Sequence, residues 1–200
     1  MRIKAKYLIG IDEVGRGPLA GPITVAAVYC SAASAKDIFQ GIKDSKKLSA
    51  KQREEWRRKF KILNFKFKII YSTASVNNQI IDTIGINKAT DLAIKKVISN
   101  LKRKIAATPS NCFIVLDGLL KAPKKYPQET IIKGDEKIPI ISAASIIAKV
   151  TRDRKMIRFH KKFPNYHFNF HKGYGTKLHY EMLKKFGLSF IHRKSYCKIL

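Results

Sequence analysis

Acidic residues are scarce in this chain, and their scarcity is the first clue to its partners. Only 14 Asp and Glu stand against 41 Lys and Arg in 200 residues, which gives a formal net charge of +27. An excess of this size in a chain long enough for one domain points to a polyanion as partner. A lysine-rich proteome that spreads lysine over every protein surface would give the same count, so charge alone leaves both explanations open.

Cysteine and long apolar runs are scarce as well. The three cysteines, Cys30, Cys112 and Cys197, are odd in number and scattered, which predicts reduced core residues of a cytosolic protein. The chain starts without a secretory signal pattern, and none of its apolar runs approaches the roughly 18 residues of a membrane span. The five histidines show no zinc-like spacing with the cysteines. We therefore expect a cytoplasmic protein with no membrane partner and no zinc.

Hydrophobic periodicity predicts an α/β domain with a mixed sheet. The apolar run at 7–9 and the run at 23–30 suggest an antiparallel pair of strands, and helices then alternate with strands. The expected strands cover 7–9, 23–30, 65–71, 112–116 and 130–135. The expected helices cover 49–61, 75–83, 87–104, 142–161 and 176–186, with a break at Gly85, a cap at Thr176 and a stop at Gly187.

Four carboxylates stand where predicted strands end. They are Asp12, Glu13, Asp117 and Asp135. Ligands gather at such strand ends in α/β sheets. Carboxylates brought together repel one another in low dielectric, and a divalent cation relieves that repulsion; oxygen-only ligands favour Mg²⁺ or Mn²⁺. The alternative is a set of unrelated surface acids, with the first pair in a salt-bridged turn.

Three small or charged residues, Gly15, Arg16 and Gly17, follow the first pair of acids. The segment is too short for a Rossmann or Walker motif. Glycine lets the backbone approach a ligand closely, and exposed backbone amides can bind the 2′-hydroxyl that separates RNA from DNA. The alternative, in which Arg16 pairs with Asp12 or Glu13 inside a tight turn, is compatible with that role.

Seven short motifs, taken in order, resemble the signature of type 2 ribonuclease H, the bacterial ribonuclease HII, from Tyr7 to about Tyr196. Each motif is weak alone and the ordered set is specific. They are Asp12-Glu13-Val14-Gly15-Arg16-Gly17, Lys43-Asp44-Ser45-Lys46-Lys47-Leu48, Leu116-Asp117-Gly118, Lys133-Gly134-Asp135, Ser142-Ala143-Ala144-Ser145-Ile146-Ile147-Ala148-Lys149, His171-Lys172-Gly173-Tyr174-Gly175-Thr176 and His192-Arg193-Lys194-Ser195.

The resemblance implies a fold and a reaction. The fold is ribonuclease H-like, with about five strands flanked by helices, in one catalytic domain over 1–200 whose part from about 160 to 200 is helical and contacts substrate. The reaction is hydrolysis of the RNA strand of RNA–DNA hybrids and nicking 5′ to ribonucleotides embedded in DNA, which leaves 5′-phosphate and 3′-hydroxyl ends. The four acids hold two Mg²⁺ or Mn²⁺ ions roughly 4 Å apart, one activating water and one stabilising the leaving oxygen.

The resemblance also assigns substrate contacts. The Gly15–Arg16–Gly17 segment reads the 2′-hydroxyl, and Tyr174 packs on the deoxyribose beside the RNA–DNA junction. Contacts to backbone phosphate are expected from the remaining residues, although a solvated loop or helix face is the plain alternative for most of them. These residues are Ser45, Lys46, Lys47, Ser145, Lys149, Arg152, His171 and Lys172.

Two other functions remain as alternatives. A type HIII ribonuclease H usually has an additional N-terminal substrate-binding domain, and here only six residues precede Tyr7. A catalytically inactive, basic nucleic-acid-binding module would gain from losing acids next to phosphate, so the four intact acids argue against it.

Leu119 and Leu120 depart from the more polar loop usual in the family, and Tyr196 stands where phenylalanine is common. We expect a monomer, and the C-terminus to Leu200 shows no evident peptide for a sliding clamp.

Overall fold

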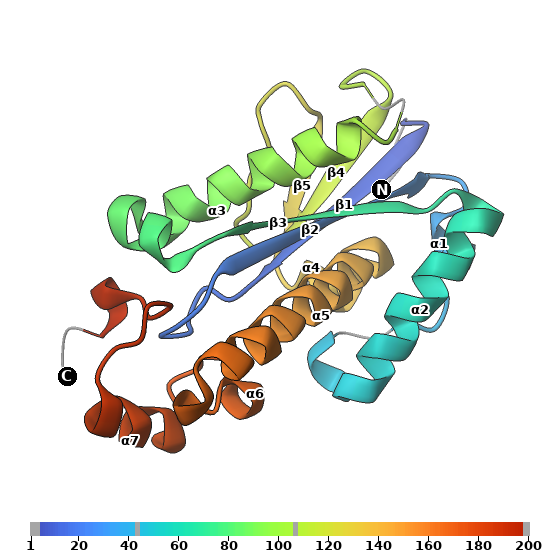
Figure 1. Cartoon of the computed structure of the whole chain (residues 1–200). Helices are drawn as coiled ribbons and strands as arrows, with labels where there is room; N and C mark the ends of the chain where they lie inside the picture. Colours follow the sequence, from blue (N-terminus) through green and yellow to red (C-terminus); the bar gives the residue numbers. More distant parts are fainter. Residues whose placement is uncertain (1–4, 43–44, 106–107, 198–200) are drawn as a thin grey trace.

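A mixed five-stranded sheet forms the centre of the protein. The computed structural model describes residues 5–42, 45–105 and 108–197. The strands lie in the order β3-β2-β1-β4-β5 (Figure 1). β1 pairs antiparallel with β2 and parallel with β4. Their bounds are β1 Tyr7–Val14, β2 Ile23–Ser31, β3 Ile70–Val76, β4 Cys112–Asp117 and β5 Gln128–Ile131. The mixed sheet expected from the sequence is confirmed.

Helices cover both faces of the sheet. α3 lies on one face, while α5 and α2 lie on the other (Figure 1). A short helix, α6, and a longer one, α7, follow α5 and form, with the segment after them, the C-terminal region. The helices are α1 Ala35–Ile38, α2 Ala50–Phe67, α3 Asn78–Lys102, α4 Gly134–Lys137, α5 Pro139–Lys162, α6 Phe168–His171 and α7 Lys177–Phe186, with 3₁₀ turns at Ser45–Lys47, Pro164–Tyr166 and Lys194–Tyr196.

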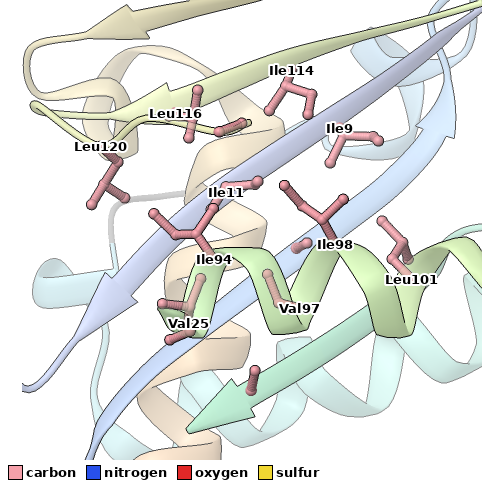
Figure 2. Packing of buried hydrophobic residues seen from close by; sticks show 14 of the residues in the cluster. Ile9, Ile11, Val25, Ile94, Val97, Ile98, Leu101, Ile114, Leu116 and Leu120 are labelled. Carbon is pink, nitrogen blue, oxygen red and sulfur yellow. The ribbon is translucent and has the colours of Figure 1, made fainter. Parts of the chain in front are cut away.

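The alternation of side chains along β1 decides which residues reach which face. Ile9 and Ile11 pack against α3 in a cluster with Ile94 and Val97 (Figure 2). Leu8 belongs to the cluster under α5. Because side chains alternate along a strand, Asp12 lies on the α5 face of the sheet and Glu13 on the α3 face. Two adjacent acids therefore approach the same sheet edge from opposite faces.

A close approach of α5 to β1 depends on Gly10. A Cβ atom at this position would lie 2.5 Å from the carbonyl oxygen of Ile140, well inside any real contact. The absence of a side chain allows the N-terminal turns of α5 to lie directly on the strand. This packing brings Ser145 of α5 next to Asp12.

The strand predicted over 65–71 is wrong for the first part of that segment. α2 continues to Phe67, and β3 begins only at Ile70. The apolar and basic residues of this segment alternate, but Phe60, Leu63 and Phe67 also recur at helical spacing. These three side chains pack on the cluster under α5. Tertiary burial along one helix face therefore outweighed the local alternation.

The helix predicted at 75–83 also begins later than expected. Ser75 belongs to β3, and Asn77 caps α3 by accepting a hydrogen bond from the backbone N–H of Ile80 at 3.0 Å. The predicted break at Gly85 is confirmed as a kink with φ 78°. The cap at Thr176 and the stop at Gly187 are likewise confirmed.

The expectations about the cysteines and about membrane-spanning segments can be compared with the structure. The three cysteines are free and buried, as predicted. Within the described residues, none of the helices has the length and apolar character that crossing a bilayer requires.

Candidate active site

A cleft of about 200 Å³ opens at the ends of the two central parallel strands. All four acids singled out in the sequence line it, although they come from β1, β4 and α4. The cleft lies where ligands gather in open α/β sheets. The residues that line it are Asp12, Glu13, Val14, Ser45, Lys46, Asp117, Asp135, Ser145, Lys149 and Tyr174.

Asp12 is buried, as is Asp135. The carboxylate of Asp12 accepts a hydrogen bond from the backbone N–H of Glu13 at 2.7 Å and another from the Ser145 hydroxyl. Ser145 in turn shares a 2.8 Å hydrogen bond with Ser45. Burial raises the pKa of Asp12 well above its ordinary value, and the charge of Glu13 raises it further. Asp12 thus carries a charge that its surroundings stabilise poorly.

Glu13 has one carboxylate oxygen without a partner. Its Oε2 is buried, and the described residues offer it no hydrogen bond. Burial raises the pKa of Glu13, the guanidinium of Arg16 lowers it, and the charge of Asp117 raises it again. An unpaired buried oxygen next to two further carboxylates is a costly arrangement that a cation would relieve.

Asp117 and Asp135 are linked through the start of α4. Asp117 Oδ1 accepts hydrogen bonds from the backbone N–H groups of Gly134 at 2.7 Å and Asp135 at 3.2 Å. Asp135 was predicted at the end of a strand, and this is wrong: β5 ends at Ile131, and Asp135 lies in the first turn of α4. A left-handed residue, Lys133 with φ 56°, turns the chain between them.

Lysine balances part of the negative charge. Lys46 Nζ lies 2.8 Å from Asp135 Oδ2 across the cleft. Lys47, also exposed, lies 3.9 Å from Glu136. Lys149 donates to Asp153 at 2.9 Å, and its Nζ lies 5.7 Å from the centre of the Tyr174 ring. The flanking residues 43–44 of the predicted phosphate loop lie outside the described residues.

The acids share the cleft without forming a closed cage. Within the described ranges, no three His, Cys, Asp or Glu side chains converge tightly enough to hold an ion as they stand. The donor set nevertheless fits a hard divalent cation, because it consists of carboxylate oxygens, one of which, Glu13 Oε2, is buried without a partner.

The glycine-containing loop after β1 is held by two buried arginines. Arg193 donates to the carbonyl oxygens of Gly15, Arg16 and Gly21 at 2.5–3.0 Å. Arg152 donates to the carbonyls of Ala20, Pro22 and Lys172 at 2.9–3.0 Å. Both side chains are 0% exposed. Their role is to fix the backbone around the cleft.

The phosphate contact expected from Arg152 is therefore wrong, because its guanidinium is buried and hydrogen-bonded to backbone carbonyls. The sequence placed Arg193 in a motif without revealing what it does. A buried arginine has no local signature, since most of its partners here are backbone carbonyls more than a hundred residues away.

The Arg16 side chain is hydrogen-bonded to α3 and lines a pocket together with Glu13, whose pKa its charge lowers. It donates to Asn87 at 2.5 Å and to Thr90 at 3.3 Å. The described residues show no ion pair between Arg16 and Asp12 or Glu13, so the tight salt-bridged turn is not what forms. Gly15 adopts φ 99°, a conformation that favours glycine, and a Cβ there would lie 2.4 Å from Arg152 Nε.

Besides Arg152, several predicted substrate contacts do not line this cleft, namely Gly15, Arg16, Gly17, Lys47, His171 and Lys172. His171 is 8% exposed, and both ring nitrogens are hydrogen-bonded to backbone groups, so its expected phosphate contact is contradicted. Lys172 is half-buried and donates to the carbonyl of Asn169. Tyr174 does line the cleft and is 39% exposed, with Arg152 5.7 Å below its ring centre.

Three buried histidines behind Tyr174 make stability depend on pH. Burial lowers the pKa of His171, His179 and His192 to about 4, from an ordinary value of 6.5. Between these values the unfolded chain binds more protons than the folded one. Their stabilising effect is therefore complete above about pH 6.5 and declines as the pH falls toward 4. The raised pKa values of Asp12 and Glu13 act in the opposite direction.

We expect His171→Gln to show a weaker loss of stability on acidification than the wild type. Glutamine retains a donor for the Tyr166 carbonyl but cannot take up the proton. Between pH 7 and pH 5 the free energy of unfolding should fall by about 1–2 kcal/mol less in the variant. Urea denaturation at both pH values measures this, and equal losses would contradict a neutral buried imidazole.

Comparisons with known proteins agree with this geometry. A curated ribonuclease HII from Caldicellulosiruptor bescii is 45% identical over 193 residues, 96% of this chain and 87% of that protein. The structure resembles that of the PCNA:RNase HII complex from Archaeoglobus fulgidus, with TM-score 0.73, 27% identity and coverage of 96% and 95%. It also resembles Bst-RNase HIII in complex with Mn²⁺, with TM-score 0.71, 21% identity and coverage of 93% and 64%.

The fold and the carboxylate cleft together define a nuclease of the ribonuclease H class. The profile described as Ribonuclease HII matches residues 9–199. The chain belongs to the ribonuclease HII family. It is a ribonuclease H, an endonuclease that acts on the RNA of RNA–DNA hybrids.

Proposed function

We propose that this ribonuclease HII nicks duplex DNA on the 5′ side of embedded ribonucleotides by two-metal hydrolysis. The observation that carries the proposal is the single cleft in which Asp12, Glu13, Asp117 and Asp135 meet, with Tyr174 at its rim. Hydrolysis breaks the bond between phosphorus and the 3′ oxygen of the preceding nucleotide. Water supplies the new oxygen on phosphorus, so the products carry a 5′-phosphate and a 3′-hydroxyl.

The four acids are the proposed ligands of Mg²⁺ or Mn²⁺. Bound divalent ions supply Lewis-acid activation of water and stabilise charge on the leaving oxygen. Asp12 is positioned by the Ser145 hydroxyl and by the Glu13 amide, and Asp117 by the first amides of α4. The Mn²⁺ complex of the HIII relative supports the choice of metal.

The rim of the cleft supplies the proposed substrate contacts. The backbone of Gly15, Arg16 and Gly17 faces the 2′-hydroxyl, in a loop that the buried arginines hold in place. Tyr174 packs on the sugar that follows the ribonucleotide. Cations and hydroxyls around the same cleft neutralise backbone phosphates, and they are Ser45, Lys46, Lys47, Ser145 and Lys149.

Digestion of a labelled duplex with one ribonucleotide tests the proposal. We expect one product, ending one nucleotide before the ribonucleotide in a 3′-hydroxyl, in the presence of Mn²⁺ or Mg²⁺. Chelator should abolish the reaction, and an all-DNA duplex is the matched control. A product ending 3′ to the ribonucleotide, or equal cutting of the control, would refute the cleavage chemistry.

We propose further that the protein works as a monomer in the cytoplasm. The archaeal relative is found in a complex with PCNA.

A further inference from the structure

A cluster of three imidazoles lies behind Tyr174, outside the catalytic cleft. His171 and His179 stack with ring centres 4.2 Å apart and an interplanar angle of 19°. His179 and His192 join through their Nε2 atoms at 2.9 Å. All three are buried, and Phe168 packs edge-on against the first two. Among the described residues no histidine lines the catalytic cleft, so this cluster needs another explanation.

The hydrogen-bond partners fix one tautomer for each ring. The Gly173 amide donates to His171 Nδ1, so His171 carries its proton on Nε2 and donates to the Tyr166 carbonyl. The Ser189 amide donates to His192 Nδ1, so His192 also carries its proton on Nε2. That proton is donated to His179 Nε2.

His179 must then carry its proton on Nδ1. From there it donates to the carbonyl oxygen of Tyr174 at 2.9 Å. The hydrogen bonds of the three rings are therefore all satisfied only when every ring is neutral, in agreement with their low pKa values. A further proton on His179 would have to lie on Nε2, facing the proton of His192.

The same cluster is joined to the glycine-containing loop. His192 forms an isolated antiparallel bridge with Ala20, and the Leu19 amide donates to the Gly173 carbonyl at 2.8 Å. The next residue, Arg193, holds the carbonyls of Gly15 and Arg16. A short path of hydrogen bonds thus connects the backbone of Tyr174 with the loop proposed to contact the 2′-hydroxyl.

We propose that the His179–His192 pair positions Tyr174 relative to the glycine-containing loop and thereby sets the preference for a ribonucleotide followed by DNA. This inference rests on the proposed contact of Tyr174 with the sugar. His179 touches neither substrate nor metal ligands and acts through the Tyr174 backbone. Its removal should affect junction selectivity more than general hybrid cleavage.

Two amide variants of His179 separate positioning from simple packing. Asparagine places a donor near the Nδ1 position and keeps the bond to the Tyr174 carbonyl. Glutamine places its amide near the Nε2 position, keeps an acceptor for His192 and loses the donor to Tyr174. The two side chains share the same chemistry, so each is the matched control for the other.

We expect His179→Gln to lower the ratio of single-ribonucleotide nicking to cutting of a long RNA–DNA hybrid about five- to tenfold, the equivalent of one lost hydrogen bond. His179→Asn should restore most of the ratio. Added to Tyr174→Ala, His179→Gln should lower the ratio no further, because both changes remove the same contact. Equal losses on both substrates, or additive losses with Tyr174→Ala, would make His179 a packing residue only.

Nitrogen NMR of the imidazoles in the full wild-type chain gives a readout that needs no activity. The expected pattern is a proton on Nδ1 of His179 and on Nε2 of His171 and His192, unchanged at pH 6. Any other pattern overturns the inference. If Tyr174→Ala alone leaves the ratio at the wild-type value, the proposed role of Tyr174 fails, and the imidazole pattern then decides by itself whether the pair holds the Tyr174 carbonyl.

Discussion

Asp12→Asn should abolish cleavage while leaving the protein as stable as the wild type or more stable. A cation at this site contributes several kcal/mol to the reaction, so the loss of its charged ligand should slow cleavage by about 1,000-fold or more. Asparagine retains an oxygen that can accept from the Glu13 amide and from Ser145. It removes a buried charge that Glu13 and Asp117 repel.

The two readouts of this variant are a single-turnover rate and a melting temperature. Each kcal/mol of relieved repulsion should raise the Tm by about 2–4 °C. The sign follows from the pKa of Asp12: it is raised in the fold, so the fold disfavours the charged form present at pH 7. Glu55→Gln, an exposed acid on α2, should change neither quantity. A lower Tm for Asp12→Asn would make Asp12 a structural acid.

Arg193→Ala should be the most destabilising single change outside the hydrophobic core. It removes four hydrogen bonds and leaves the buried carbonyls of Gly15, Arg16 and Gly21 without their donor. A loss of about 3–5 kcal/mol is expected, or a Tm lower by roughly 10 °C. Nicking should also fall, because the glycine-containing loop loses its support.

Two further variants serve as comparisons for the stability loss of Arg193→Ala. Arg154→Ala breaks a pair with Glu54 that is partly exposed, so it should cost less than about 1 kcal/mol. Arg193→Lys keeps the charge but cannot reach three carbonyls, and it should recover only part of the stability. Equal unfolding free energies for Arg193→Ala and Arg154→Ala would show that the buried guanidinium does not hold the loop.

Local patterns in the sequence located three of the four acids correctly. The strand ends at Asp12, Glu13 and Asp117 followed from apolar runs, and the cap at Thr176 followed from residue type and spacing. These features depend on residues a few positions apart, and neighbours in the sequence are neighbours in the structure.

Only the three-dimensional packing decided the remaining features. Asp135 moved from a strand end to a helix start because Asp117, 18 positions earlier, binds the amides of α4. Arg152 and His171 resembled surface residues in the sequence, yet both are buried. Arg152 binds carbonyls of Ala20 and Pro22, more than a hundred residues away, and His171 is enclosed by the packing of the C-terminal region.

The sequence of this protein thus determined where three of the proposed metal ligands lie, Asp12, Glu13 and Asp117, because apolar periodicity ends where a strand ends and leaves these acids there. It could not determine how those residues are held. The carbonyl groups that fix Arg152 and Arg193 are the same in every residue and carry no side-chain signature. The buried imidazoles take their tautomers from contacts such as that of His179 with His192, which exist only once the C-terminal region has packed on the sheet.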